Sequence, residues 1–474
     1  MKIRNLALVL IFLLAAAYAG ATWHFSNKAA DALEAWPQKI AQRAPMVSVV
    51  NSEYRKGFLS STQTITLQGP AAPGAGAPQQ VTLRNVIQHG PFPGFNSVGT
   101  ARIEHELVFD PATAAELAKV FGGQPVLQAT TLVDFVGGGT TDLKGAPATY
   151  RAGTESVAWQ GFTGKVRFAR DAAAYSIDLT APGLAFTGKD GASGELKALT
   201  LKTDQTRMAN TESVYLGKVA MGIASFAMNK DGKPVFELKD VAANSEVTSK
   251  ATDLIDVTAA ATAAEVRTPG FEATKAEYAF SFKHLHAPTL DRISKASQEM
   301  NEKLAAHKGS NPADVIAMQP GMMEMWTSNG IALLKYEPVI AIDRVGFVTK
   351  DGATTIAGNA RVVGVTDADL KAPLGMLAKI QAEASLSIAE PVAAALFTES
   401  RAKALQAAGA PQMSPEALAE FVAQARQAFD AQLAGLVEAG YVIRDNGVLT
   451  SKIAFNGGQV TVNGKPFNGM PAKQ

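Results

Sequence analysis

The histidines are the residues whose types and spacing most directly suggest chemistry, and the chain has six of them. His284 and His286 stand two positions apart on a predicted strand, so both rings would point to one face, where two imidazoles can bind a metal. No third ligand at a recognisable spacing accompanies them in the sequence. We therefore interpret the pair as surface or interface histidines and predict neither a metal site nor a cofactor.

The run Glu104-His105-Glu106 has the residue types for acid–base catalysis. Side chains alternate along a strand, so the two glutamates would face one way and the histidine the other, and no dyad would assemble locally. The sequence also lacks a Gly-x-Ser-x-Gly elbow, a Walker-type phosphate loop and a His-Glu-x-x-His motif. We predict no catalytic residues and a protein that is not an enzyme. A hydrolase of envelope polymers, which needs clustered carboxylates in one cleft, is an alternative.

The segment His89-Gly90-Pro91-Phe92-Pro93 is unusual because its prolines impose an extended path and remove backbone donors. Gly90 permits a turn beside them. The segment predicts a structural corner in which His89 bonds to the backbone and Phe92 packs. A binding loop is the alternative.

The charge balance and the cysteine content exclude several classes of protein. Lys and Arg number 44 and Asp and Glu 43, so the formal charge of +1 gives no field for a polyanion, and we predict no nucleic-acid binding. The absence of cysteine excludes disulfides, thiolate nucleophiles, iron–sulfur clusters and cysteine-based zinc sites. It also suits an oxidising exterior.

The N-terminus predicts attachment to a membrane. Lys2 and Arg4 precede the apolar segment Leu6–Ala21, and positive charge holds that end in the cytoplasm. The apolar core is short for a span of about 20 residues, but Trp23 and Phe25 can complete it as interface anchors. We expect a single pass through a bacterial cytoplasmic (inner) membrane with the body in the periplasm.

A cleaved signal peptide is the competing interpretation of the same residues. Ala17-Tyr18-Ala19 offers a small-x-small site, so cleavage between Ala19 and Gly20 stays open. The anchor is favoured because Ala29–Arg43 continues as a charged, alanine-rich helical pattern until Pro45.

The elements that would position these residues are mostly strands. Thr62–Leu67 alternates with a period of two, and Val345–Thr349 followed by Thr354–Ile356 predicts a hairpin. Ser156–Phe168, Tyr175–Phe186 and Glu195–Lys202 are predicted neighbouring strands of an antiparallel meander. The tight-turn dipeptides between strands are Asp190-Gly191, Asp231-Gly232, Asp351-Gly352, Asn446-Gly447 and Asn463-Gly464.

Helical patterns occur in several places after the N-terminal segment, one of which starts at Asn311-Pro312, is interrupted at Pro320-Gly321 and resumes to Leu334. A short helix is predicted at Asp110–Phe121, with Asp110 as its N-cap and Gly122 past its end. Leu290–Ala306 is helical, and a helix over Ala417–Ala439 follows the cap Ser414 and carries an apolar stripe.

The predicted fold class is α+β, mainly an antiparallel β-sheet of hairpins and meanders, with a helical insertion or subdomain and one N-terminal transmembrane helix before it. We predict five segments. They are a transmembrane anchor (1–27), a stalk helix (28–45), a β-rich periplasmic domain (46–287), a helix-rich region with a β-hairpin (288–440) and C-terminal strands returning to the sheet (441–474).

The chain resembles the YdgA-like family of bacterial inner-membrane-anchored periplasmic proteins of unknown function. The resemblance rests on the hydrophobic N-terminus, the Asn-Gly and Gly-Gly turns near the end, and two motifs. The motif residues are Tyr54, Gly57 and Phe58, followed by His89, Gly90, Pro91, Phe92 and Pro93. Relatives carry an acidic residue before the histidine, where this chain has Gln88. The resemblance implies an uncleaved anchor and a periplasmic body, and it supplies no catalytic residues.

The leading functional hypothesis is a non-enzymatic binding or scaffolding role in the cell envelope. It rests on a large anchored ectodomain without a catalytic constellation. The alternative is binding or transfer of a lipid or other apolar ligand in a β-sheet groove. Expected partners are the membrane, through Leu6–Ala21, and a lipid or an envelope protein. Open sheet edges make a homo-oligomer a further hypothesis.

Overall fold

A computed structural model describes residues 3–34, 37, 48–69, 80–306, 330–366, 368–369, 373–407 and 414–467, without the side chains of 3–14, 300–306 and 373–374. The chain forms two compact units. Unit 1 holds Met1–Gly222 and Leu290–Thr327, and unit 2 holds Ile223–Thr289 and Ser328–Gln474. The five segments predicted from sequence stay predictions.

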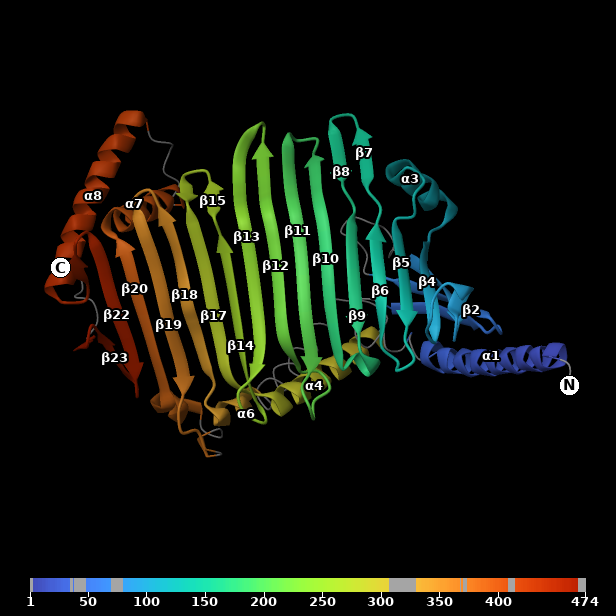
Figure 1. Ribbon diagram of the computed structural model, residues 1–474. Coiled ribbons are helices and arrows are strands. Elements are labelled where there is room, and N and C mark those ends of the chain that lie inside the picture. Colours follow the sequence, from blue (N-terminus) through green and yellow to red (C-terminus); the bar gives the residue numbers. More distant parts are fainter. Residues whose placement is uncertain are drawn as a thin grey trace. The chain divides into compact units, whose positions relative to one another are not determined.

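Unit 1 is built on an antiparallel meander. Its strands pair in the order β1-β2-β3-β4-β5-β6-β9-β10-β11, while β7 pairs with β8 and β8 also pairs with β10 (Figure 1). The bounds are β1 Ser48–Arg55, β2 Ser60–Gln68, β3 Gln80–His89, β4 Ala101–Val108, β5 Leu127–Val133, β6 Gly139–Gly145, β7 Ala148–Ala152, β8 Glu155–Trp159, β9 Phe162–Phe168, β10 Ala174–Thr187 and β11 Ala192–Arg207. A further strand, β12 (Tyr215–Lys230), has residues in both units.

The prediction of neighbouring strands in this region is confirmed, with one correction. Ser156–Phe168 is two strands, β8 and β9, because Gly161 has a φ of 82° that ends the extended run. β8 and β9 pair with different parts of β10, so the two halves remain neighbours of the same strand.

One helix of unit 1 begins and ends where local chemistry predicts. α3 (Pro111–Phe121) is capped by Asp110, whose carboxylate accepts from the backbone N–H groups of Ala112 and Thr113, and it ends at Gly122 with a φ of 61°. α1 (Ile3–Glu34) is one continuous helix from the predicted span into the predicted stalk. The other elements are η1 (Pro93–Phe95), η2 (Arg170–Ala172) and α4 (Ala287–Ala306), most of which belongs to unit 1.

Among the residues described with their side chains, the structure has no helix both long and apolar enough to cross a membrane. The first part of the predicted span, through Leu14, lies outside that set, as does most of the predicted stalk after Glu34.

Unit 2 is a second antiparallel arrangement. Its strands pair in the order β13-β14-β17-β18-β19-β20-β22-β23-β24, with β15 between β13 and β16 and with β21 on β22. The bounds are β13 Lys233–Ser249, β14 Leu254–Ala263, β15 Glu265–Thr268, β16 Phe271–Ala273, β17 Lys275–His286, β18 Val339–Thr349, β19 Gly352–Val362, β20 Ile380–Ala389, β21 Ile443–Asp445, β22 Val448–Asn456, β23 Gln459–Val462 and β24 Lys465–Pro466. The hairpin predicted around Asp351-Gly352 is confirmed as β18 and β19.

Two long helices of unit 2 pack against each other, α7 (Glu390–Ala407) and α8 (Pro415–Glu438). Figure 1 shows both beside the strands of the C-terminal half of the chain. α8 was predicted from its cap, and the Ser414 hydroxyl accepts from the backbone N–H of Ala417 (3.2 Å). α7 was not predicted. The short helices of unit 2 are α6 (Ile331–Leu333), η4 (Leu334–Tyr336) and η6 (Pro373–Lys379).

Candidate functional site

The sequence motifs meet where α1 contacts β1, β2 and β3. The Ser26 hydroxyl of α1 donates to the backbone oxygen of Gly57 (3.0 Å). The Gly57 N–H donates to the Ser61 hydroxyl (3.1 Å), and that hydroxyl lies 2.8 Å from His89 Nε2. Burial and, to a smaller extent, the charge of Lys56 lower the pKa of His89.

A Ser–His pair has the residue types of a nucleophile and its base. Here Ser61 is 2% exposed and His89 is 1% exposed, so the pair lies in the protein interior rather than in a cleft. Sequence reasoning did not pair these two residues, because they stand on different strands, β2 and β3, and their contact depends on strand pairing. The contact between the two side chains links β2 to β3 next to α1 and so stabilises the packing there.

The corner after His89 also contacts α1. The ring of Tyr18 stacks on Phe92 (centroids 6.3 Å apart) and on Phe95 (5.9 Å apart). Gly90 passes so close to the backbone of Gly99 that a Cβ atom there would collide with the Gly99 carbonyl oxygen. The glycine in this motif is therefore required by a close backbone approach.

A row of polar side chains continues beneath α1. Gln63 Nε2 donates to the backbone oxygen of Leu33 (2.6 Å), and Asn85 Nδ2 donates to Gln63 Oε1 (3.0 Å). His105 Nδ1 lies 2.8 Å from Asn85 Oδ1, and its Nε2 lies 2.9 Å from the Thr131 hydroxyl. Burial lowers the pKa of His105, so the folded unit favours the neutral ring.

The neighbouring glutamates point away from this row, as strand alternation predicts. Glu104 pairs with Arg102 (2.6 Å) and Glu106 with Arg84 (3.6 Å). The two glutamates and His105 therefore lie on opposite faces of the sheet. Tyr54 of β1 pairs in register with Gln63, and burial raises its pKa. Phe58 is exposed in the turn after β1.

His284 and His286 have different partners. His284 has a φ of 59° and lies at an irregular point of β17, where its Nδ1 is 3.2 Å from the backbone oxygen of Glu337. His286 stacks on Tyr336 with ring centroids 3.8 Å apart, and its Nδ1 is 2.9 Å from the Thr289 hydroxyl. Across the residues that the structure describes, no three His, Cys, Asp or Glu side chains group as metal ligands.

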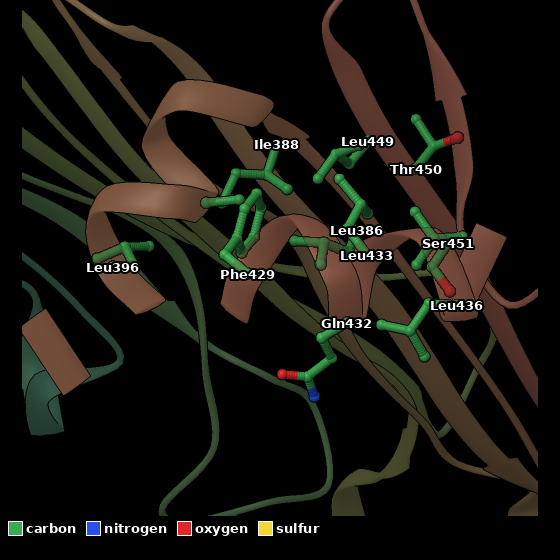
Figure 2. Close-up of a pocket in the computed structure, with 12 residues that line it drawn as sticks. Leu386, Ile388, Leu396, Phe429, Gln432, Leu433, Leu436, Leu449, Thr450 and Ser451 are labelled. Carbon is green, nitrogen blue, oxygen red and sulfur yellow. The ribbon is translucent and has the colours of Figure 1, made fainter. Parts of the chain in front are cut away.

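The candidate binding site is an apolar groove in unit 2, between α8 and strands β20 and β22. A cavity of about 250 Å³ lies against α7 and α8, and one of about 440 Å³ continues along the strands. They adjoin because both are lined by Leu386, Leu436, Val442 and Ser451. Figure 2 shows the first cavity, with Phe429 and Leu433 of α8 on one side and Leu449 on another.

The groove is the end of an apolar face that the strand register creates. Directly opposed residues of neighbouring strands lie on the same face of a sheet. One such row is Tyr278, Val345, Ile356, Leu386 and Ser451, and the next is Phe280, Ile342, Gly358, Ala384, Ile453 and Val462.

The other face of the same strands carries polar partners. Lys452 pairs with Glu383 (3.1 Å), and Arg361 Nε donates to Gln381 Oε1 (2.9 Å). The sheet of unit 2 is therefore amphipathic, and several large side chains of its apolar face are left exposed. They are Tyr278, Ile340, Ile342, Ile356, Leu386 and Ile453.

A buried carboxylate fixes the helices that border the groove. Glu390, the first residue of α7, is 7% exposed and accepts from Arg444 Nε (2.7 Å) and Nη2 (2.9 Å). Arg426 Nη2 of α8 also donates to it (3.2 Å). The Glu390 side chain thereby links α7, α8 and β21. Its hydrogen bonds from the two arginines are charge-assisted, and the two bonds from Arg444 also fix the relative orientation of the side chains.

Sequence reasoning assigned no groove residue to a binding site, although the apolar stripe predicted for Ala417–Ala439 contains Phe429, Leu433 and Leu436. The available signal was the alternation of large apolar residues in Tyr278-Ala279-Phe280-Ser281-Phe282 and in β22, which marks one apolar face. The register that aligns these residues, and α7 that borders them, could not be derived from that signal.

Comparison with known proteins gives a family. The model described as "Bacterial protein of unknown function (DUF945)" matches residues 1–469. No curated protein matches the chain.

Proposed function

The chain belongs to this bacterial protein family of unknown function, DUF945, and from its own residues we propose that it binds an acyl chain or a comparable apolar ligand in the groove of unit 2. The observation that carries the proposal is the pair of adjoining cavities with a nearly continuous apolar lining. Small-molecule sites are typically concave and apolar with a few polar groups. Here those groups include Gln432, Thr450 and Ser451 in the first cavity and Ser385 in the second.

The apolar face favours an elongated ligand over a compact one. The exposed row that includes Ile356, Leu386 and Ile453 extends the groove across neighbouring strands. Burial of one methylene contributes ~0.8 kcal/mol, so a segment of about ten methylenes contributes ~8 kcal/mol before the cost of ordering the chain.

We place this binding in the cell envelope, as a non-enzymatic activity of a protein held at the cytoplasmic membrane by Leu6–Ala21 with its body in the periplasm. The uncharged N-terminal segment and the likeness to the YdgA-like proteins support this placement. An acyl-binding protein there would carry or hold lipid between membrane surfaces. A scaffold for envelope proteins is the second candidate, favoured because β1 pairs on one side only, with β2, among the residues that the structure describes.

The first test is to purify the full chain gently from membranes and quantify bound lipid by mass spectrometry. The second is to titrate the protein with a fluorescent fatty acid and compare two variants. Ile453→Asp puts a carboxylate into the groove at a residue that is 45% exposed, so folding should survive. Asn456→Asp is the matched control, because it adds the same charge to the same strand on the opposite face.

A carboxylate at residue 453 that displaces about three methylenes of the ligand reduces the binding free energy by ~2.4 kcal/mol. The dissociation constant of the fatty acid should therefore rise roughly 50-fold. The control should bind like the unmodified protein. Equal affinity of the two variants, or purified protein that carries protein partners and no stoichiometric lipid, would contradict acyl binding and favour the scaffold.

A further inference from the structure

We propose that unit 1 carries a membrane-docking collar in the lipid headgroup region. It is formed by Trp23 of α1, the loop between β3 and β4 and the loop between β5 and β6. The collar consists of Trp23, Phe92, Phe95, Val98, Phe135 and Val136. The inference goes beyond acyl binding in unit 2, and it rests on the proposed membrane attachment through α1.

The two loops lie side by side against the same helix. The Thr100 hydroxyl donates to the backbone oxygen of Asp134 (3.1 Å), which joins the end of one loop to the start of the other. Tyr18 of α1 stacks on Phe95, and Phe25 of α1 packs on Phe135 with centroids 5.8 Å apart. The aromatic residues of both loops therefore gather around one stretch of α1.

These side chains are exposed although they are large and apolar. Phe95 is 75% exposed, and Phe135 and Val136 are 53% and 74% exposed. Soluble surfaces rarely gather such residues in one patch without a partner. Phe95 also has a φ of 59°, a conformation that costs a bulky residue free energy.

The position of the collar along α1 identifies lipid as its partner. Ala15, Ala16 and Ala17 are exposed, and the helix contacts the body from Tyr18 onward. Figure 1 shows α1 extending beyond the strands toward its N-terminus. From Leu6 to Trp23 the helix rises about 27 Å, close to the ~30 Å of a hydrocarbon core.

The collar would therefore lie at the outer boundary of the bilayer, where aromatic side chains are enriched. Its apolar rings would supplement a span that is itself short. The residues that follow are polar, since Lys28 is exposed and Lys56 bonds to the Asn27 amide. This order, from apolar through aromatic to basic, fits entry into a lipid surface rather than docking of a protein partner.

The absence of cysteine allows a clean test by single labels on the full chain. We would attach an environment-sensitive fluorophore at Phe95→Cys and, separately, Phe135→Cys, both at exposed sites that tolerate substitution. Ala15→Cys reports the attachment itself, and Glu116→Cys on α3 is the aqueous reference, since its side chain is 72% exposed. The proteins are reconstituted in phosphatidylethanolamine–phosphatidylglycerol vesicles and quenched by nitroxide lipids or by aqueous iodide.

We expect the labels at residues 95 and 135 to emit at shorter wavelength and to be quenched by shallow nitroxide lipids at least about threefold more than the label at 116. If both behave like residue 116 while residue 15 reports lipid, the collar proposal fails and the attachment stands. If residue 15 is also quenched only by iodide, the attachment fails and the collar with it. Neither result bears on the groove of unit 2.

Discussion

Removal of the Glu390 carboxylate should loosen both helices that border the groove, because it bonds to Arg426 of α8 and to Arg444 of β21. In Glu390→Gln the side chain keeps its shape but loses its charge, so the three hydrogen bonds from Arg444 and Arg426 lose the carboxylate acceptor. The amide oxygen still accepts, but the amide nitrogen cannot accept from an arginine. Hydrogen bonds to charged groups contribute about 1.5–3 kcal/mol each. The low end applies because Arg444 and Arg426 are 56% and 46% exposed, so water screens them.

Three bonds at ~1.5 kcal/mol each, less about 1.5 kcal/mol returned because a carboxylate is no longer buried, leave a cost of ~3 kcal/mol. A cost of that size speeds amide exchange through local opening about 100-fold, since each 1.4 kcal/mol is tenfold. The effect should appear in peptides of α7, the second half of α8 and β21, because those elements meet at this carboxylate.

Hydrogen–deuterium exchange with mass spectrometry is the assay, and Glu383→Gln is the matched control. Glu383 forms an ion pair with Lys452 on the same sheet, but both side chains are more than half exposed, so its loss should cost less than about 1 kcal/mol. Tryptophan fluorescence checks unit 1, since the tryptophans that the structure describes, Trp23 and Trp159, both lie there. Exchange in Glu390→Gln equal to that in Glu383→Gln would refute the reasoning.

Two further predictions concern unit 1, whose unfolding by urea can be followed through its tryptophans. Burial lowers the pKa of both His89 and His105 from 6.5, so the unfolded state binds more protons at acid pH. The contribution of both rings to stability is complete above pH 6.5 and is lost as the pH falls from 6.5 through the lowered folded values. His105→Gln should make the pH dependence of the urea midpoint shallower, and an unchanged slope would show that the ring does not titrate as inferred. Gly90→Ala should lower the free energy of unfolding by about 1–3 kcal/mol through the collision with Gly99, while Gly69→Ala, with open space around it, should change it little.

Local features of this protein were readable from the sequence because their causes are local. Asp110 and Ser414 cap helices through bonds to backbone atoms within three residues, so the start of α3 and of α8 followed from short motifs. Asp351-Gly352 turns β18 into β19 for the same reason, since a tight turn needs residues that tolerate positive φ. The strand between Ser156 and Phe168 was misjudged where Gly161 interrupts an otherwise strand-like run.

Only the tertiary structure brought distant residues together. α7 escaped prediction because its apolar residues, mostly alanines, do not form a clear stripe, and its position depends on Glu390 meeting Arg444 more than fifty residues later. The pair Ser61 and His89, and the row from Gln63 to His105, exist only through the register of β2, β3 and β4.

The groove also depends on contacts between residues that are far apart in the sequence. Alternation along each strand places Tyr278, Leu386 and Ile453 on the apolar face of their own strands. It does not determine which strands pair with one another. That choice belongs to pairing between strands far apart in the chain, which aligned these faces on one side of unit 2. The sequence by itself determined an amphipathic, antiparallel, cysteine-free chain with an apolar N-terminus. The long-range pairing decided where its apolar surface gathers, because contacts between distant residues have no local signature.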